Sequence, residues 1–144
     1  MKKYITIISI IICTLCIILF DTNIASATNI PEFLDGDGSI DHPYVIANKS
    51  QFYNALNYPA ANFLLFVDLN FGADEIKTFS TFSGTFNGNN HKIIFSYEKL
   101  SSPLFGELSG IVNNLTISGK FFTAAFANSV SRKGVISKCR NEGE

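Results

Sequence analysis

The sequence predicts an all-β protein, a right-handed parallel β-helix, because short apolar runs recur in it at a constant period. Residues 110–119 align with residues 134–143 at one offset (134 − 110 = 24), and a glycine begins and ends each segment. Leu104-Phe105-Gly106 recurs as Ala125-Phe126-Ala127 (125 − 104 = 21). Such periods are typical of solenoids, in which a repeat buries its apolar face only against neighbouring repeats.

The first 27 residues have the three parts of a secretory signal peptide. Lys2 and Lys3 precede an apolar run over residues 4–20, and the small-residue sequence Ala25-Ser26-Ala27 follows. The alternative is a membrane anchor, but the apolar run is short for a span of about 20 residues and contains two cysteines. We therefore expect cleavage after Ala27, a secreted or cell-surface location and no membrane span in the mature protein.

Composition limits the mature chain to one domain with few classes of partner. Removal of the signal peptide leaves 144 − 27 = 117 residues, with 9 basic and 11 acidic side chains. This weakly negative chain has no feature that would attract nucleic acid or an anionic membrane. Cys139 is the one cysteine left, which excludes an internal disulfide, and its place in an apolar repeat predicts a packed thiol.

Residues 28–60 are predicted to form an extended lead-in followed by one short helix. Residues 28–45 carry two glycines, two prolines and four acids, a composition that disfavours a helix. Ser50 then resembles an N-cap, and apolar residues at helical spacing predict a helix over residues 51–57, which Pro59 ends. We expect this helix to cover the N-terminal opening of the solenoid.

Residues 61–144 are predicted to form about four coils of roughly 22 residues each. The strand-like runs are separated by Gly, Asn, Ser and Asp and lie at residues 63–69, 82–86, 92–97, 104–105, 111–117, 121–126 and 135–139. The 24-residue offset places Val112 over Ile136 and Leu115 over Cys139 as interior pairs. Asn114 is expected at a bend, with Lys138 as its equivalent in the next coil.

The register of residues 88–97 stays open at this point. Ile93 aligns with Leu115 at an offset of 22 residues and with Val112 at an offset of 19 (115 − 93 = 22; 112 − 93 = 19).

Residues 84–93, Gly-Thr-Phe-Asn-Gly-Asn-Asn-His-Lys-Ile, resemble the G-T-F-D-G-N-G-H-x-I motif of bacterial β-helix surface proteins with GLUG repeats. Residues 36–46, 50–52, 103–106 and 135–143 resemble further segments of that family in the same order. The resemblance implies a β-helix and a surface function, and the same repeats occur in zinc metallopeptidases that cleave immunoglobulin A. Asn87, Asn90 and Lys138 depart from the family pattern, and the chain stops within what should be a continuing array.

No catalytic, cofactor or metal constellation is predicted. His42 and His91 lie outside any H-E-x-x-H setting, and Asp35, Asp37 and Asp41 lack the glycine and glutamate of an EF-hand loop. The remaining acids are scattered and form no pair suited to glycoside cleavage.

The phenylalanines are expected mainly in the core. The alternative is an exposed aromatic stripe that stacks on carbohydrate, with Tyr97, Phe121 and Phe122 as the first candidate binding residues.

These observations together predict a non-catalytic surface module for adhesion or ligand binding. Its expected partner is a host or cell-envelope molecule, with carbohydrate among the candidates; neither the ligand nor the mode of attachment is specified. The alternative is an accessory arm or fragment of a larger surface protease or of a β-helix carbohydrate-active enzyme. Self-association is expected through the C-terminal coil edge, with a Cys139 to Cys139 crosslink under oxidising conditions.

Overall fold

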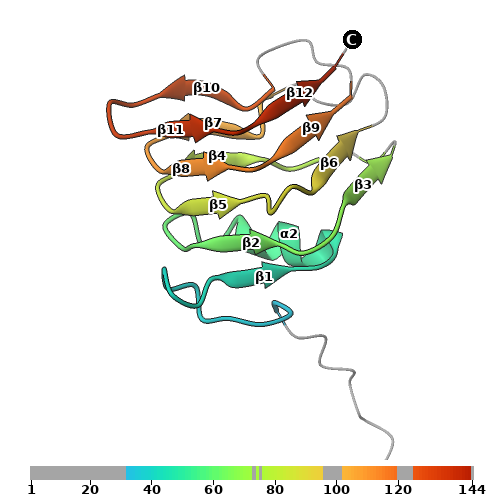
Figure 1. The fold of residues 1–144 in the computed structure, drawn as a ribbon, viewed down its shortest axis with the longest axis vertical. Helices are drawn as coiled ribbons and strands as arrows, with labels where there is room; N and C mark the ends of the chain where they lie inside the picture. The colour runs from blue at the N-terminus through green and yellow to red at the C-terminus, as the bar shows by residue number, and fades with distance from the viewer. Residues whose placement is uncertain (1–31, 73, 75, 96–101, 120–124, 144) are drawn as a thin grey trace, which may run out of the picture. The chain divides into compact units, whose positions relative to one another are not determined.

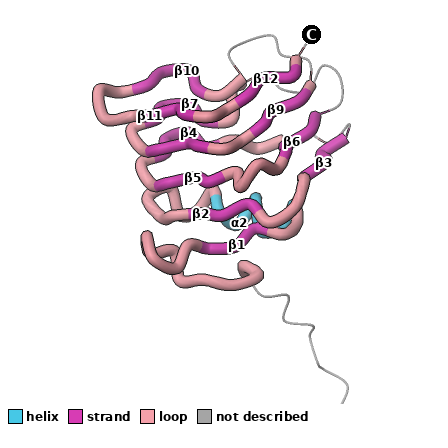
Figure 2. Tube along the Cα trace, in the orientation of Figure 1, coloured by secondary structure: helices cyan, strands magenta, loops and turns pink. Residues whose placement is uncertain are grey.

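The computed structural model describes residues 32–72, 74, 76–95, 102–119 and 125–143, which form parallel β-sheets and one short helix (Figure 1; Figure 2). This confirms the prediction of an all-β fold built from parallel strands. The predicted signal peptide lies outside the described residues. The elements are β1 (Tyr44–Ile46), α2 (Lys49–Ala55), β2 (Phe63–Leu65), β3 (Leu69–Gly72), β4 (Phe79–Phe82), β5 (Thr85–Asn87), β6 (Lys92–Phe95), β7 (Phe105–Leu108), β8 (Ile111–Asn113), β9 (Thr116–Ser118), β10 (Ala127–Val130), β11 (Val135–Ser137) and β12 (Arg140–Glu142).

The strands belong to three sheets that the chain visits in a fixed order. The strand orders are β1-β2-β5-β8-β11 in the first sheet, β3-β6-β9-β12 in the second and β4-β7-β10 in the third. From β2 onward the chain takes one strand of each sheet in turn, and we call one such round a pass. Successive passes therefore lie side by side in every sheet, and equivalent residues form columns across the strands.

Two of these columns run through the core. Phe86 pairs with Val112, and Val112 pairs with Ile136, as the 24-residue offset predicted. Phe86 and Val112 are fully buried, whereas Ile136 is 38% exposed because β11 is the last described strand of its sheet. In the next column Leu115 is buried and Cys139 is half-buried.

The register of β6 is set by a third column, which differs from both alignments that the sequence left open. Ile93 pairs with Ile117 (117 − 93 = 24) and with Leu69 on its other side (93 − 69 = 24). The alignments with Leu115 and Val112 were therefore wrong. Leu115 precedes β9, and Ile117 is the residue that takes the inward position.

The offset in the third sheet is also corrected by one residue. Phe105 pairs with Ala127 (127 − 105 = 22), so β10 begins later than the predicted run over residues 121–126. Residues 121–124 of that run lie outside the described residues.

Bends in a left-handed conformation divide the passes and explain why single predicted runs became two strands. Asn90, Asn114 and Lys138 lie 24 residues apart and have φ angles of 64°, 51° and 51°. Asparagine tolerates this region better than most residues. The run over residues 111–117 is therefore broken into β8 and β9, and Asn114 and Lys138 are equivalent, as predicted.

The helix begins two residues earlier than predicted and has a different N-cap. Asn48 has an extended backbone, and its side chain accepts a hydrogen bond from the Gln51 backbone N at 2.9 Å. Gln51 in return accepts one from the Ala47 backbone N at 2.7 Å, an exchange that resembles a capping box. Ser50, the expected cap, lies inside the first turn.

Phenylalanine dominates the core of the described region. The fully buried rings are those of Phe52, Phe63, Phe71, Phe79, Phe82, Phe86 and Phe105. Phe52 of α2 contacts Phe71 edge-on with ring centroids 5.4 Å apart, and Phe79 stacks on Phe105 at 5.3 Å. Each such burial contributes about 1.5–3 kcal/mol. Most described phenylalanines thus fill the core, as predicted, whereas Phe66 is exposed.

Candidate functional site

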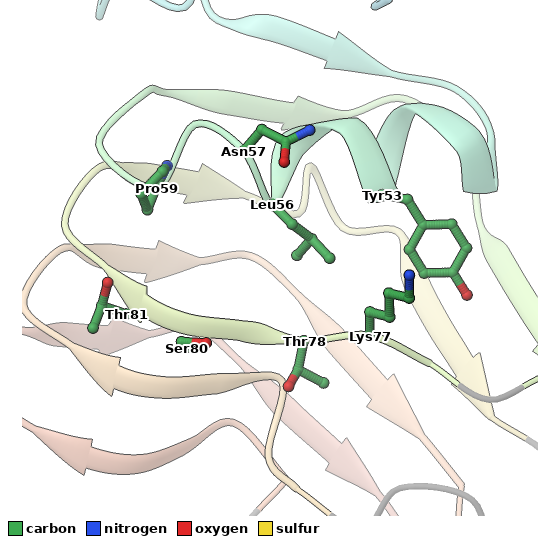
Figure 3. Close-up of a pocket in the computed structure, with 8 residues that line it drawn as sticks. All are labelled: Tyr53, Leu56, Asn57, Pro59, Lys77, Thr78, Ser80 and Thr81. Atoms are coloured by element: carbon green, nitrogen blue, oxygen red, sulfur yellow. The ribbon is translucent and has the colours of Figure 1, made fainter.

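A groove lies between the C-terminal part of α2 and the edge strand β4, with a volume of about 560 Å³ (Figure 3). β4 is the first strand of the three-stranded sheet, so one of its edges faces away from β7. The lining residues are Tyr53, Leu56, Asn57, Pro59, Lys77, Thr78, Ser80 and Thr81. Two segments more than twenty residues apart in the chain therefore form its two walls.

Hydrogen bonds join the two walls at one end of the groove. The carbonyl oxygen of Pro59 accepts from the backbone N of Ser83 at 2.8 Å and from the Ser83 hydroxyl at 3.5 Å. Ser83 directly follows β4, so the loop after the helix is tied to the end of the strand. This contact keeps the width of the groove fixed at that end.

Aromatic packing holds the helical wall. The Tyr53 ring lies edge-on to Phe52 at 6.1 Å and to Phe71 at 5.7 Å, and Phe52 is fully buried. A ring packed on two others has little rotational freedom. Tyr53 therefore brings an ordered aromatic side chain to the groove.

The opposite wall follows from the alternation of β4. Phe79 and Phe82 are buried, whereas Ser80 and Thr81 are exposed, as is Lys77 just before the strand. Side chains of successive strand residues point to opposite faces, so burial of the phenyl rings places hydroxyl groups at the surface. Figure 3 shows these side chains on the strand that faces Leu56 of the helix.

The groove can exchange many hydrogen bonds but offers little for catalysis or metal binding. Six of its eight lining side chains carry a hydroxyl, amide or ammonium group, and Leu56 and Pro59 are the two apolar ones. None of the eight is a carboxylate, an imidazole or a thiol, the groups needed for acid–base chemistry or to hold a transition metal. Within the described ranges no three His, Cys, Asp or Glu side chains lie close enough to bind a metal ion.

A second polar cluster lies where the chain turns into β6. The Asp68 carboxylate accepts a hydrogen bond from the Lys92 backbone N at 2.9 Å, and its Oδ1 lies 3.0 Å from Nδ1 of His91. The backbone hydrogen bond from Lys92, together with His91, lowers the pKa of Asp68. These contacts join neighbouring passes, which fits the predicted place of His91 in a turn before a strand.

The predicted binding residues Tyr97, Phe121 and Phe122 lie outside the described residues. The groove was missed by the sequence analysis, although Phe79-Ser80-Thr81-Phe82 shows the pattern of a strand with an apolar inner and a polar outer face. The place of the helix beside that strand is a tertiary feature that no local pattern encodes.

Comparisons with models of protein families, with curated proteins and with solved structures give no significant match. Among the described residues no helix is long and apolar enough to cross a membrane.

Proposed function

We propose that this protein is an exported, non-catalytic surface module that binds carbohydrate in the groove between α2 and β4. The observation that carries the proposal is the lining itself: an ordered tyrosine ring, one lysine and several hydroxyl and amide groups on a fixed backbone. A sugar presents hydroxyl groups that both donate and accept hydrogen bonds, and apolar C–H faces that pack on an aromatic ring. A groove of this size also lies within the usual range of small-ligand sites, about 300–1,000 Å³.

The proposed framework is a right-handed parallel β-helix of about four coils with α2 as its N-terminal cap. It is supported by the regular order in which the chain visits the three sheets and by the rule that crossovers between parallel strands are right-handed. Membership in the GLUG-repeat surface proteins, which the segment over residues 84–93 resembles, and export through the N-terminal signal peptide are parts of the same proposal. A rigid coil stack of this kind would hold the groove in one shape at the cell surface.

A non-catalytic role is favoured by the side chains of the groove. Glycoside cleavage needs two carboxyl groups about 5–9.5 Å apart on either side of the scissile bond. The groove lining contains no such group, so a bound sugar would meet hydrogen-bond partners but no proton donor of suitable pKa.

The proposal is tested with a panel of immobilised neutral and acidic oligosaccharides from bacterial envelopes and from host glycans. We expect at least one member to bind the purified protein, and the substitution Thr81→Trp to weaken that binding at least about tenfold by filling the groove. Ser129→Trp is the matched control, because Thr81 and Ser129 both align with Glu107 in the same sheet but Ser129 lies outside the groove. Absence of binding across the panel, or equal binding by the Thr81→Trp variant, would refute the groove as a glycan site.

A further inference from the structure

The two ends of the described fold carry opposite charge. Residues 32–48 contain four carboxylates and no lysine or arginine, and all four are exposed: Glu32, Asp35, Asp37 and Asp41. Residues 130–143 contain four exposed cations and one acid: Arg132, Lys133, Lys138, Arg140 and Glu142. Because Glu142 is ion-paired with Lys92 at 2.7 Å, the C-terminal end keeps a positive excess.

These two segments lie at opposite ends of the stack of strands. Residues 34 and 35 run along the outer edge of β1, since Leu34 N donates to Val45 O at 2.9 Å and Val45 N donates to Asp35 O at 2.8 Å. β1 is the first strand of the five-stranded sheet and β11 is its last (Figure 1). The acidic segment therefore covers one end, and the basic residues surround the other.

Both ends also expose large apolar side chains next to their charges. Leu34 and Ile40 are 50% and 77% exposed at the acidic end. Val130, Val135 and Ile136 are 38–49% exposed at the basic end, although the residues that pair with Val130 and Ile136, Leu108 and Val112, are fully buried. An apolar centre surrounded by charge is the usual composition of a protein interface.

We propose that the basic C-terminal end binds the acidic N-terminal end of a second copy of this chain, so that copies associate head to tail. Opposite charges then face each other, and exposed apolar side chains of the two ends are covered together. A contact between two C-terminal ends would instead bring four cations against four, an arrangement that costs several kcal/mol. The head-to-tail contact joins two different surfaces, so it can propagate into an open chain of copies.

This arrangement refines the self-association expected from the sequence. That expectation joined two C-terminal edges and allowed a Cys139 to Cys139 crosslink. In the structure Cys139 is half-buried, and its thiol donates to the Ser137 carbonyl at 3.2 Å and lies 3.6 Å from that of Val112. Burial also raises the pKa of this thiol, which keeps it protonated and poorly reactive. The proposal does not depend on the groove or on its ligand.

Two variants, each altered at one end, test the direction of assembly. Ile40→Lys/Asp41→Lys makes the N-terminal end repel a basic partner, and Arg132→Glu/Lys133→Glu makes the C-terminal end repel an acidic one. All four residues are exposed, so the changes do not touch the core. Head-to-tail assembly predicts that each variant alone is monomeric, and that an equimolar mixture forms a 1:1 dimer through the two unaltered ends.

Sedimentation velocity at about 1–100 µM is the measurement, in about 20 mM and about 500 mM NaCl, which brackets weak and strong screening. We expect the unaltered protein to associate at low salt, and its association constant to fall at least about tenfold at high salt. Glu107→Lys, a charge reversal on the middle strand β7, is the control and should associate like the unaltered protein. A monomeric unaltered protein, or an N-terminal-end variant that still dimerises alone, would overturn the proposal.

Discussion

The N-terminal end of the described fold is closed by aromatic rings and backbone pairing, whereas the C-terminal end shows the inside of its last pass. At the first end Phe33 stacks on Tyr44 at 4.1 Å, and the edge of β1 is hydrogen-bonded to residues 34 and 35. At the second end Ile136, the inward residue of β11, is 38% exposed. Equivalent positions in one column thus range from full burial to partial exposure.

This difference teaches where stability is concentrated in such a stack. A residue in a middle strand is covered on both sides, and its removal leaves a cavity that neighbours cannot close. A residue in the last strand has a neighbour on one side, so part of its apolar area stays in water in the folded state. Mutational cost should therefore fall along each column toward the C-terminal end.

The largest expected effect compares the buried helix with the open end. Phe52→Ala removes a fully buried ring that contacts Phe71, Phe79 and Phe86, and it should lower the free energy of unfolding by about 3–5 kcal/mol. Ile136→Ala should cost about 1 kcal/mol or less, because much of that side chain is already hydrated. Urea denaturation followed by circular dichroism measures both. If Phe52→Ala does not fold, Phe52→Leu gives the same ranking at smaller amplitude, and equal losses at the two ends would contradict the comparison.

A smaller effect sharpens the account of how α2 begins. Asn48→Ala removes the side chain that caps the helix and should cost about 1 kcal/mol, since one backbone donor of the first turn loses its partner. Ser50→Ala is the matched control and should change stability little, because Ser50 is exposed within the first turn. Thermal unfolding followed by circular dichroism is sufficient. A larger loss at Ser50 would restore the cap that the sequence suggested.

The contrast between these two residues shows what the sequence could and could not predict. Both Asn48 and Ser50 are good N-caps, and the choice depends on where the chain leaves β1, which is a tertiary constraint. The inward columns were predictable because the 24-residue offset carries Val112 onto Ile136 directly. The register of Ile93 was not, because Leu115 and Ile117 are both apolar and the left-handed bend at Asn90 decides between them.

The candidate site was less predictable than the fold for a related reason. Its strand wall can be derived from the alternation over residues 79–82, but its other wall is a helix that follows β1 where later passes place a strand. A one-residue shift of that helix would change which of Tyr53, Leu56 and Asn57 face β4. A binding surface formed between two elements therefore depends on their docking, which sequence periodicity does not specify.

The smallest expected effect concerns the ion pairs that hold the last strand. Glu142 in β12 lies 2.7 Å from the Lys92 ammonium in β6, and Arg140 lies 3.4 Å away. The hydrogen bond from Lys92, aided by the charges of Lys92 and Arg140, lowers the pKa of Glu142 below its ordinary value. A carboxyl whose pKa is lowered on folding stabilises the fold above its unfolded pKa, and this contribution is lost as the pH falls through the folded value.

Acidification should therefore loosen the C-terminal end first. Between neutral pH and pH about 3 we expect the wild type to lose a few degrees of thermal midpoint more than Glu142→Gln, because only the wild type has this pair to lose. Glu107→Gln, an exposed residue on β7, should keep the wild-type pH dependence. Hydrogen exchange locates the change: amides of β12 should lose protection at low pH before those of β5, which lies between β2 and β8. Simultaneous loss in both strands would mean that the last pass is as firmly held as the middle of the stack, and that the exposed residues at this end mark no weak point.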